Sequence, residues 1–124
     1  MDDLIAFLRA RLDEDEQVAR ATMWDGSGNR AEWSLPASAT VNVGGDEFYA
    51  GDRTIANHIV RQAPARVLRE AEAKRRILYL AEQLPKVTAS MDMFDNHRDA
   101  WAEVLKQLAL PYADHPDYRE EWRP

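Results

Sequence analysis

The sequence predicts an α+β fold of about four helices, with a small antiparallel β-hairpin or three-stranded sheet inserted after the first helix. Near the start of the chain, apolar residues recur at helical spacing, namely at Leu4, Ile5, Leu8 and Leu12. Residues 40–43 instead alternate between polar and β-branched apolar side chains, which is typical of a strand with one buried face. Helical spacing returns from residue 54.

A length of 124 residues predicts a single domain, 1–124. Its expected segments are a helix at 1–21, a β-rich insert at 22–53, helices at 54–84, a connector at 85–93, a helix at 94–110 and an aromatic, acidic tail at 111–124.

The first helix is expected to be amphipathic. Asp2 and Asp3 suit its N-terminus, because carboxylates there complement the exposed N–H groups. The side opposite the Leu positions is charged and is expected to face solvent; it carries Arg9, Arg11, Glu14 and Glu16.

The β-rich insert has turn residues between short β-prone runs. A turn cluster at 26–29 precedes RAEWSL, and SATVNV follows after Pro36 and Ala37, which we expect to form a turn. Gly44 and Gly45 precede EFYA, so a tight hairpin turn is expected there.

The helices at 54–84 have recognisable start and stop residues. Asp52 or Thr54 can cap the first, Pro64 fits the first turn of the second, and Pro85 follows its end. In this second helix the apolar stripe drifts, from Val67, Leu68, Ala71 and Leu78 to Ala73, Ile77, Leu80 and Leu84. Such a face can contact two partners.

The helix at 94–110 carries a stripe that includes His97 and Trp101, and Pro111 ends it. His97 is therefore expected to be a packed, hydrogen-bonded core residue. Composition is ordinary for a globular protein, with 45% apolar residues and four Trp. The net charge of −6 disfavours bulk nucleic acid and anionic membranes, and no window is apolar enough to span a bilayer, so a cytoplasmic protein is expected.

No metal or cofactor is expected. Cysteine is absent, His58, His97 and His115 are far apart in sequence, and the consecutive acids at 13–16 point in different directions on a helix. The sequence also lacks a phosphate-binding glycine loop and a nucleophile elbow.

A basic stretch on the second helix of 54–84 could contact nucleic acid through Arg66, Arg69, Arg75 and Arg76. Glu70 and Glu72 lie among these residues, and Glu70 precedes Lys74 at the spacing that favours an ion pair. A solvated, ion-paired face is the favoured interpretation.

The motif Asp114-His115-Pro116-Asp117 in the tail has two interpretations. An aspartate beside a histidine can orient it as a general base, which makes His115, Asp114 and Asp117 candidate catalytic residues. Asp-Pro sequences also form turns, and no nucleophile is identified, so the turn is favoured and enzyme activity is not expected.

Three stretches resemble an uncharacterised family of small actinobacterial and actinophage proteins, domain of unknown function 6221. They are MDDLIAFLRARLDEDEQVAR, ANHIVRQAPARVLREAEAKRRIL and the closing LALPYADHPDYREEWRP, together about half of the chain. The resemblance implies an origin and a size class but no reaction. It leaves an accessory protein acting by protein–protein contact as the expected function.

Two surfaces are expected to carry that contact. One is the drifting apolar stripe of residues 66–84, through which a homodimer could form. The other is the tail, whose candidate partner-binding residues are Tyr112, Tyr118, Trp122 and Arg119. Packing of this tail back onto the first helix or the long helix is the expectation for its own fold. A ligand site lined by Tyr112 and the Asp114-His115-Pro116-Asp117 motif, and a nucleic-acid regulator, remain as alternatives.

Overall fold

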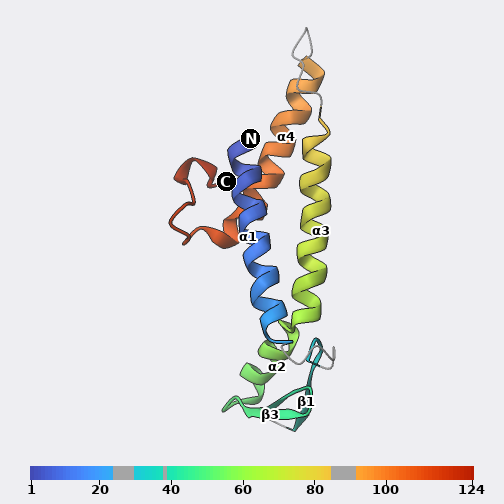
Figure 1. Cartoon of the computed structure of the whole chain (residues 1–124). Helices are drawn as coiled ribbons and strands as arrows, with labels where there is room; N and C mark the ends of the chain where they lie inside the picture. The colour runs from blue at the N-terminus through green and yellow to red at the C-terminus, as the bar shows by residue number, and fades with distance from the viewer. Residues whose placement is uncertain (24–29, 38, 85–91) are drawn as a thin grey trace. The chain divides into compact units, whose positions relative to one another are not determined.

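The computed structural model describes residues 1–23, 30–37, 39–84 and 92–124, and for 92–96 the backbone only. Within these ranges four helices and a three-stranded antiparallel sheet after the first helix confirm the α+β prediction (Figure 1). In chain order the elements are α1 (Asp2–Ala21), β1 (Trp33–Ala37), β2 (Thr40–Val43), β3 (Asp46–Tyr49), α2 (Arg53–Arg61), α3 (Pro64–Glu82), α4 (Asp92–Ala109), and the 3-10 turns η1 (Leu110–Tyr112) and η2 (Glu120–Trp122).

The chain divides into two compact units. Unit 1 comprises Met1–Asp13 and Glu72–Pro124, and unit 2 comprises Glu14–Ala71. The two boundaries fall inside α1 and α3. Folding of residues 1–124 as a single domain stays a prediction.

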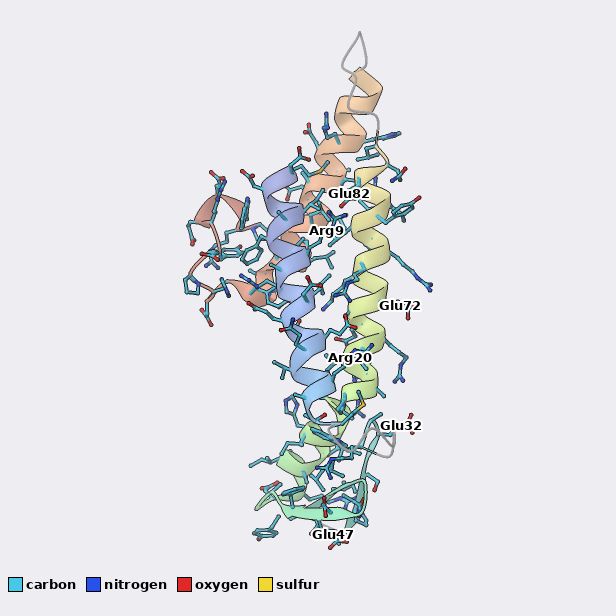
Figure 2. All side chains as sticks on the ribbon, in the orientation of Figure 1. Arg9, Arg20, Glu32, Glu47, Glu72 and Glu82 are labelled. Carbon is cyan, nitrogen blue, oxygen red and sulfur yellow. The ribbon has the colours of Figure 1, made fainter. Side chains whose placement is uncertain are left out.

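Unit 1 is built from the first part of α1, the last part of α3, α4 and the tail. Its buried apolar side chains include those predicted for α1 and residues of the other two helices: Leu4, Ile5, Leu8, Leu12, Leu78, Ala81, Leu105 and Ala109. Arg9 of α1 donates to Glu82 of α3, and these two side chains point toward one another in Figure 2. Arg75 of α3 donates to Asp13 of α1 at 2.6 Å.

Three boundaries in unit 1 differ from prediction. The helix α4 begins at Asp92 instead of residue 94 and ends at Ala109, so 92 and 93 are helix rather than connector. The helix α3 ends at Glu82. The tail begins with the 3-10 turn η1, because Pro111 lacks the N–H that would continue an α-helix. The predicted connector residues 85–91 lie outside the described residues.

Arg11 of α1 and His97 of α4 also depart from prediction. Arg11 was expected on the solvent side but is only 7% exposed, because the tail covers it. His97 was expected in the core and is exposed, so its position on the apolar stripe was misleading.

Unit 2 contains the sheet, with strand order β1-β2-β3. Its tight turn is at Gly44 and Gly45, whose φ values of 58° and 98° match a type I′ hairpin turn. This turn pairs Val43 with Asp46, and Val41 with Phe48 two residues further on.

Pro36 lies inside β1, not in the turn predicted for it. The pairing of β1 with β2 shifts register between Ser34 and Ala37, so the strand accommodates proline at an irregular place on a sheet edge. The predicted turn cluster at 26–29 lies outside the described residues.

The helix α2 is capped as expected and covers one face of the sheet. Asp52 accepts hydrogen bonds from the backbone N–H of Thr54 at 2.6 Å and Ile55 at 3.4 Å. Ala56 is fully buried with Val41 and Val43, and Trp33, Leu35, Ala50, Ile59 and Val60 pack around them. The helix α3 then begins at Pro64, as predicted.

Candidate functional site

An apolar hollow opens between the sheet and α2 in unit 2. It has a volume of about 350 Å³. Its lining combines strand, helix and loop residues: Thr22, Arg30, Trp33, Val41, Val43, Phe48, Tyr49, Ala50 and Ile59. Most of these side chains are aliphatic or aromatic, so the hollow suits an apolar group of moderate size.

Large apolar side chains remain exposed at this end of unit 2. Phe48 is 55% exposed, Tyr49 is 80% exposed, and Ile55 on α2 is 53% exposed. Single exposed apolar residues are ordinary, but Phe48 and Tyr49 also line the hollow, so exposed apolar surface adjoins it. We call Phe48 and Tyr49 the apolar rim of the hollow.

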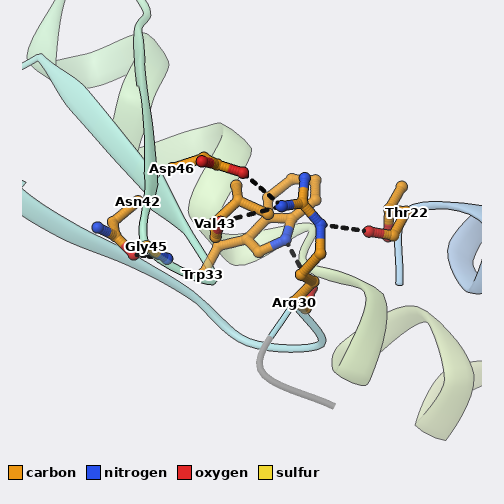
Figure 3. Close-up of polar contacts among 7 residues, drawn as sticks. All are labelled: Thr22, Arg30, Trp33, Asn42, Val43, Gly45 and Asp46. Carbon is orange, nitrogen blue, oxygen red and sulfur yellow. Dashed lines mark hydrogen bonds and ion pairs between the residues drawn. The ribbon is translucent and has the colours of Figure 1, made fainter. Parts of the chain in front are cut away.

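Arg30 holds the wall of the hollow in place. Its guanidinium donates to Asp46 Oδ2 at 2.7 Å and to the carbonyl of Thr22 at 2.9 Å, while its own carbonyl accepts from Trp33 Nε1 at 2.9 Å (Figure 3). Arg30 is 8% exposed. One buried cation thus ties the residues after α1 to the hairpin, and the hollow is largely preformed.

In unit 1 the tail packs on α1, as predicted, and the contact centres on Phe7. The Phe7 ring lies 5.0 Å from the Trp122 ring and 5.7 to 6.3 Å from three further rings, those of His115, Tyr118 and Tyr112. Phe7 is 7% and Trp122 8% exposed. We call these five residues the aromatic cluster.

His115 is a hydrogen-bond acceptor inside this cluster. Its Nδ1 accepts from Arg11 Nη1 at 2.8 Å and from the backbone N–H of Asp117 at 3.0 Å. Two donors converge on Nδ1, so the proton of the neutral ring is on Nε2. The Arg11 guanidinium also lies 5.0 Å from the Phe7 ring centroid, a cation–π contact.

The acids around His115 do not converge on it through their carboxylates. Asp114 and Asp117 are both exposed, and the contact that Asp117 makes with His115 is through its backbone N–H. This geometry is that of the turn interpretation. The candidate catalytic residues His115, Asp114 and Asp117 stay a prediction.

The candidate partner-binding residues of the tail already contact unit 1. Arg119 donates to Asp3 Oδ2 at 3.0 Å and stacks 5.3 Å from the Trp122 ring centroid. Near the end of the tail, the hydrogen bond from Arg123 lowers the pKa of Glu120. Tyr112 and Tyr118 are half-buried, so Arg119 is the candidate with the larger exposed surface.

The candidate nucleic-acid residues are mostly ion-paired within their own units. In unit 2, Arg66 donates to Glu70 at 3.0 Å, whereas the sequence had suggested Lys74 as the partner of Glu70. In unit 1, Arg76 donates to Glu72 at 2.6 Å and Arg75 to Asp13. Arg69 is exposed.

Among the described residues, no group of three or more His, Cys, Asp or Glu side chains is arranged to hold a metal ion. Nor does any helix in the described part of the chain combine the length and apolar character needed to cross a membrane.

Sequence reasoning missed Phe7, Arg11, Arg30 and Phe48. Phe7 and Arg11 are four residues apart, which places them on one face of α1, and an aromatic residue off the leucine stripe is a signal that a second surface is covered. Nothing local in the sequence singles out Arg30.

The whole chain, residues 1–124, matches a family of unknown function, DUF6221. The chain belongs to the DUF6221 family. Neither curated proteins nor solved structures gave a match. Membership of DUF6221 therefore extends the resemblance seen in three stretches to the full length, and the geometry of the hollow is the guide to function.

Proposed function

We propose that this protein is a non-enzymatic accessory protein that acts by binding another protein, and that unit 2 carries the binding surface. The observation that supports the proposal is the apolar hollow with its exposed rim of Phe48 and Tyr49. A cytoplasmic location and an actinobacterial or phage origin, which the sequence suggested, belong to the same proposal.

The hollow has the chemistry of an anchor site. A volume of about 350 Å³ fits one or two large apolar side chains, and such pockets take the central anchors of protein interfaces. The ion pair of Arg30 with Asp46 keeps the wall rigid, so little ordering cost is added on binding.

The tail contributes less to this proposal than the sequence suggested. Burial of Trp122 against Phe7 uses its apolar surface within unit 1. Partner contact through Arg119 and the outer edges of Tyr112 and Tyr118 remains a secondary expectation.

Site-specific photo-crosslinking tests the proposal. A benzophenone amino acid replaces Tyr49, which lines the hollow, in the cells that carry the gene, and adducts are identified by mass spectrometry. A matched control places the same group at Tyr79, an exposed tyrosine of α3 in unit 1. We expect a defined heterologous protein at position 49 and none, or a different set, at position 79.

A second variant separates specific binding from stickiness. Ala50→Trp fills the hollow from its own wall and leaves the rim in place. The purified partner should bind the wild-type chain by calorimetry, and Ala50→Trp should weaken that binding at least tenfold. Equal adducts at both positions, or unchanged binding to Ala50→Trp, would count against the hollow as the site.

A further inference from the structure

The two edges of the sheet differ in how open they are to another strand. The outer edge of β1 contains Pro36 and a register shift, two features that block strand addition. The outer strand at the other end, β3, has neither and carries Phe48 and Tyr49, both exposed. The described part of the chain places only β2 beside β3.

The pairing with β2 determines which backbone groups of β3 point outward. The type I′ turn makes Val43 and Asp46 a hydrogen-bonded pair, and such pairs alternate along an antiparallel ladder. The backbone N–H of Ala50 donates to the carbonyl of Ala39 at 2.8 Å, as expected if every second pair, counted from Val43 and Asp46, is hydrogen-bonded. Phe48 is therefore bonded toward β2, while the N–H and C=O of Glu47 and Tyr49 point to the open edge.

We infer that β3 is a self-association edge, on which a second copy of this chain adds its own β3 in antiparallel orientation. A two-fold axis at Phe48 places Glu47 of one copy opposite Tyr49 of the other. Every outward N–H and C=O of Glu47 and Tyr49 is then satisfied in both copies. The inference rests on which backbone groups of β3 point outward and is tested separately from the proposed function, although Phe48 and Tyr49 belong to both surfaces.

Side-chain charge and backbone conformation favour an axis at Phe48 over an axis at either neighbouring residue. An axis at Glu47 would put two carboxylates directly opposite each other, which is destabilising. An axis at Tyr49 would pair Glu47 with Gly51, whose φ of 83° interrupts an extended strand. With the axis at Phe48, each carboxylate faces a tyrosine and the two phenylalanines meet.

The second copy would also complete the hollow. Phe48 shares the face of Val41, its partner on β2, and that face is covered by α2. A two-fold axis perpendicular to the sheet keeps both α2 helices on the same face. Phe48 of the second copy then lies beside Phe48 of the first, and the two hollows join along this pair.

Cysteine substitution tests the register directly, because the chain has no cysteine of its own. At a non-hydrogen-bonded antiparallel pair, Cα atoms lie about 4.5 Å apart, within disulfide reach. Phe48→Cys should form an intermolecular disulfide under mild oxidation. Glu47→Cys and Tyr49→Cys are the matched controls, since their diagonal separation of roughly 7–8 Å exceeds that reach. We expect at least a tenfold faster reaction at position 48.

Sedimentation velocity on the full chain, from about 5 to about 500 µM, supplies the second readout. We expect a weak dimer that Glu47→Pro abolishes, because proline removes an outward N–H but no bond to β2. Phe48→Arg should abolish it without a backbone change, by placing two cations together at the axis. Leu80→Arg, on the exposed part of α3, should leave it intact.

The disulfide and sedimentation experiments distinguish a dimer through β3 from a monomer and from a dimer through the long helix. A chain that is monomeric throughout, with Phe48→Cys no faster than the controls, overturns it and leaves the crosslinking test of the hollow unaffected. A dimer lost in Leu80→Arg and kept in Phe48→Arg overturns it too, and assigns the contact to the long helix as the sequence suggested. If Glu47→Pro does not fold, the disulfide rates decide.

Discussion

Removing the Phe7 ring should be among the most damaging single changes in unit 1. Phe7 is 7% exposed and contacts four rings of the tail. A buried aromatic side chain removes about 150–250 Å² from water, and at about 25 cal/mol/Å² this gives about 4–6 kcal/mol as an upper bound. Measured Phe→Ala costs in cores are about 3–5 kcal/mol. We therefore expect Phe7→Ala to lower the free energy of unfolding by about 4 kcal/mol.

Thermal unfolding followed by circular dichroism measures this loss. An unfolding entropy of about 2.1 cal/mol/K per residue gives about 0.26 kcal/mol/K for 124 residues, so Tm should fall by about 15 °C. The matched control is Tyr79→Ala, an aromatic residue of α3 that is 60% exposed, which should change stability by about 0.5 kcal/mol or less.

A fall in Tm below about 4 °C for Phe7→Ala, equivalent to about 1 kcal/mol, would refute the central role of Phe7 in the aromatic cluster. The shape of the curve carries separate information. One transition that shifts as a whole agrees with the single domain expected for 1–124, whereas two transitions, of which only one moves, would contradict it.

Substitutions at three further positions test individual contacts. His115→Ala removes the acceptor for Arg11 and for the Asp117 N–H, and should lower the free energy of unfolding, measured by urea titration, by about 1.5–3 kcal/mol. In His115→Asn the side-chain Oδ1 can take the place of Nδ1, so this variant should lose less than half as much. The hydroxyl of Tyr118 is buried without a hydrogen-bond partner among the described residues, so Tyr118→Phe should be neutral or raise stability by up to about 1 kcal/mol; a clear loss in the same titration would reveal a partner. Hydrogen bonds from the backbone N–H groups, that of Thr54 first, lower the pKa of Asp52 in the folded chain. The ionised Asp52 carboxylate therefore stabilises the fold at pH values above the pKa of Asp52 in the unfolded chain. This stabilisation is lost as the pH falls through the pKa of Asp52 in the folded chain. Asp52→Asn keeps the cap and should flatten the acid limb of the stability–pH curve, and an unchanged acid limb would contradict this assignment.

Secondary structure was predictable because most helices and strands of this chain carry a local pattern. Apolar spacing located α1 and α3, Asp52 and Pro64 marked helix starts, and the Gly44-Gly45 pair located the hairpin. These are short-range signals, and the structure confirms them.

The misplaced residues depend on contacts that sequence spacing does not reveal. Arg11 looked solvent-facing because a charged residue off the leucine stripe normally is, but a tail 104 residues away covers it. Pro36 was placed in a turn, although a strand at a sheet edge tolerates it. Residues 40–43 carry the strand alternation in their own sequence, but the position of α2 against the sheet, which forms the hollow, is not encoded in any single segment.

The aromatic cluster has a consequence for how the protein is made. Arg11 leaves the ribosome before the tail residue His115 that covers it, and their separation of 104 residues takes about 5–20 s at ordinary rates of synthesis. Throughout that interval the apolar face of the nascent α1 around Phe7 has no tail to cover it. A growing chain in this state is a natural client for a chaperone, and slowed translation should increase its aggregation more than it would for a protein whose first helix packs on its immediate neighbours.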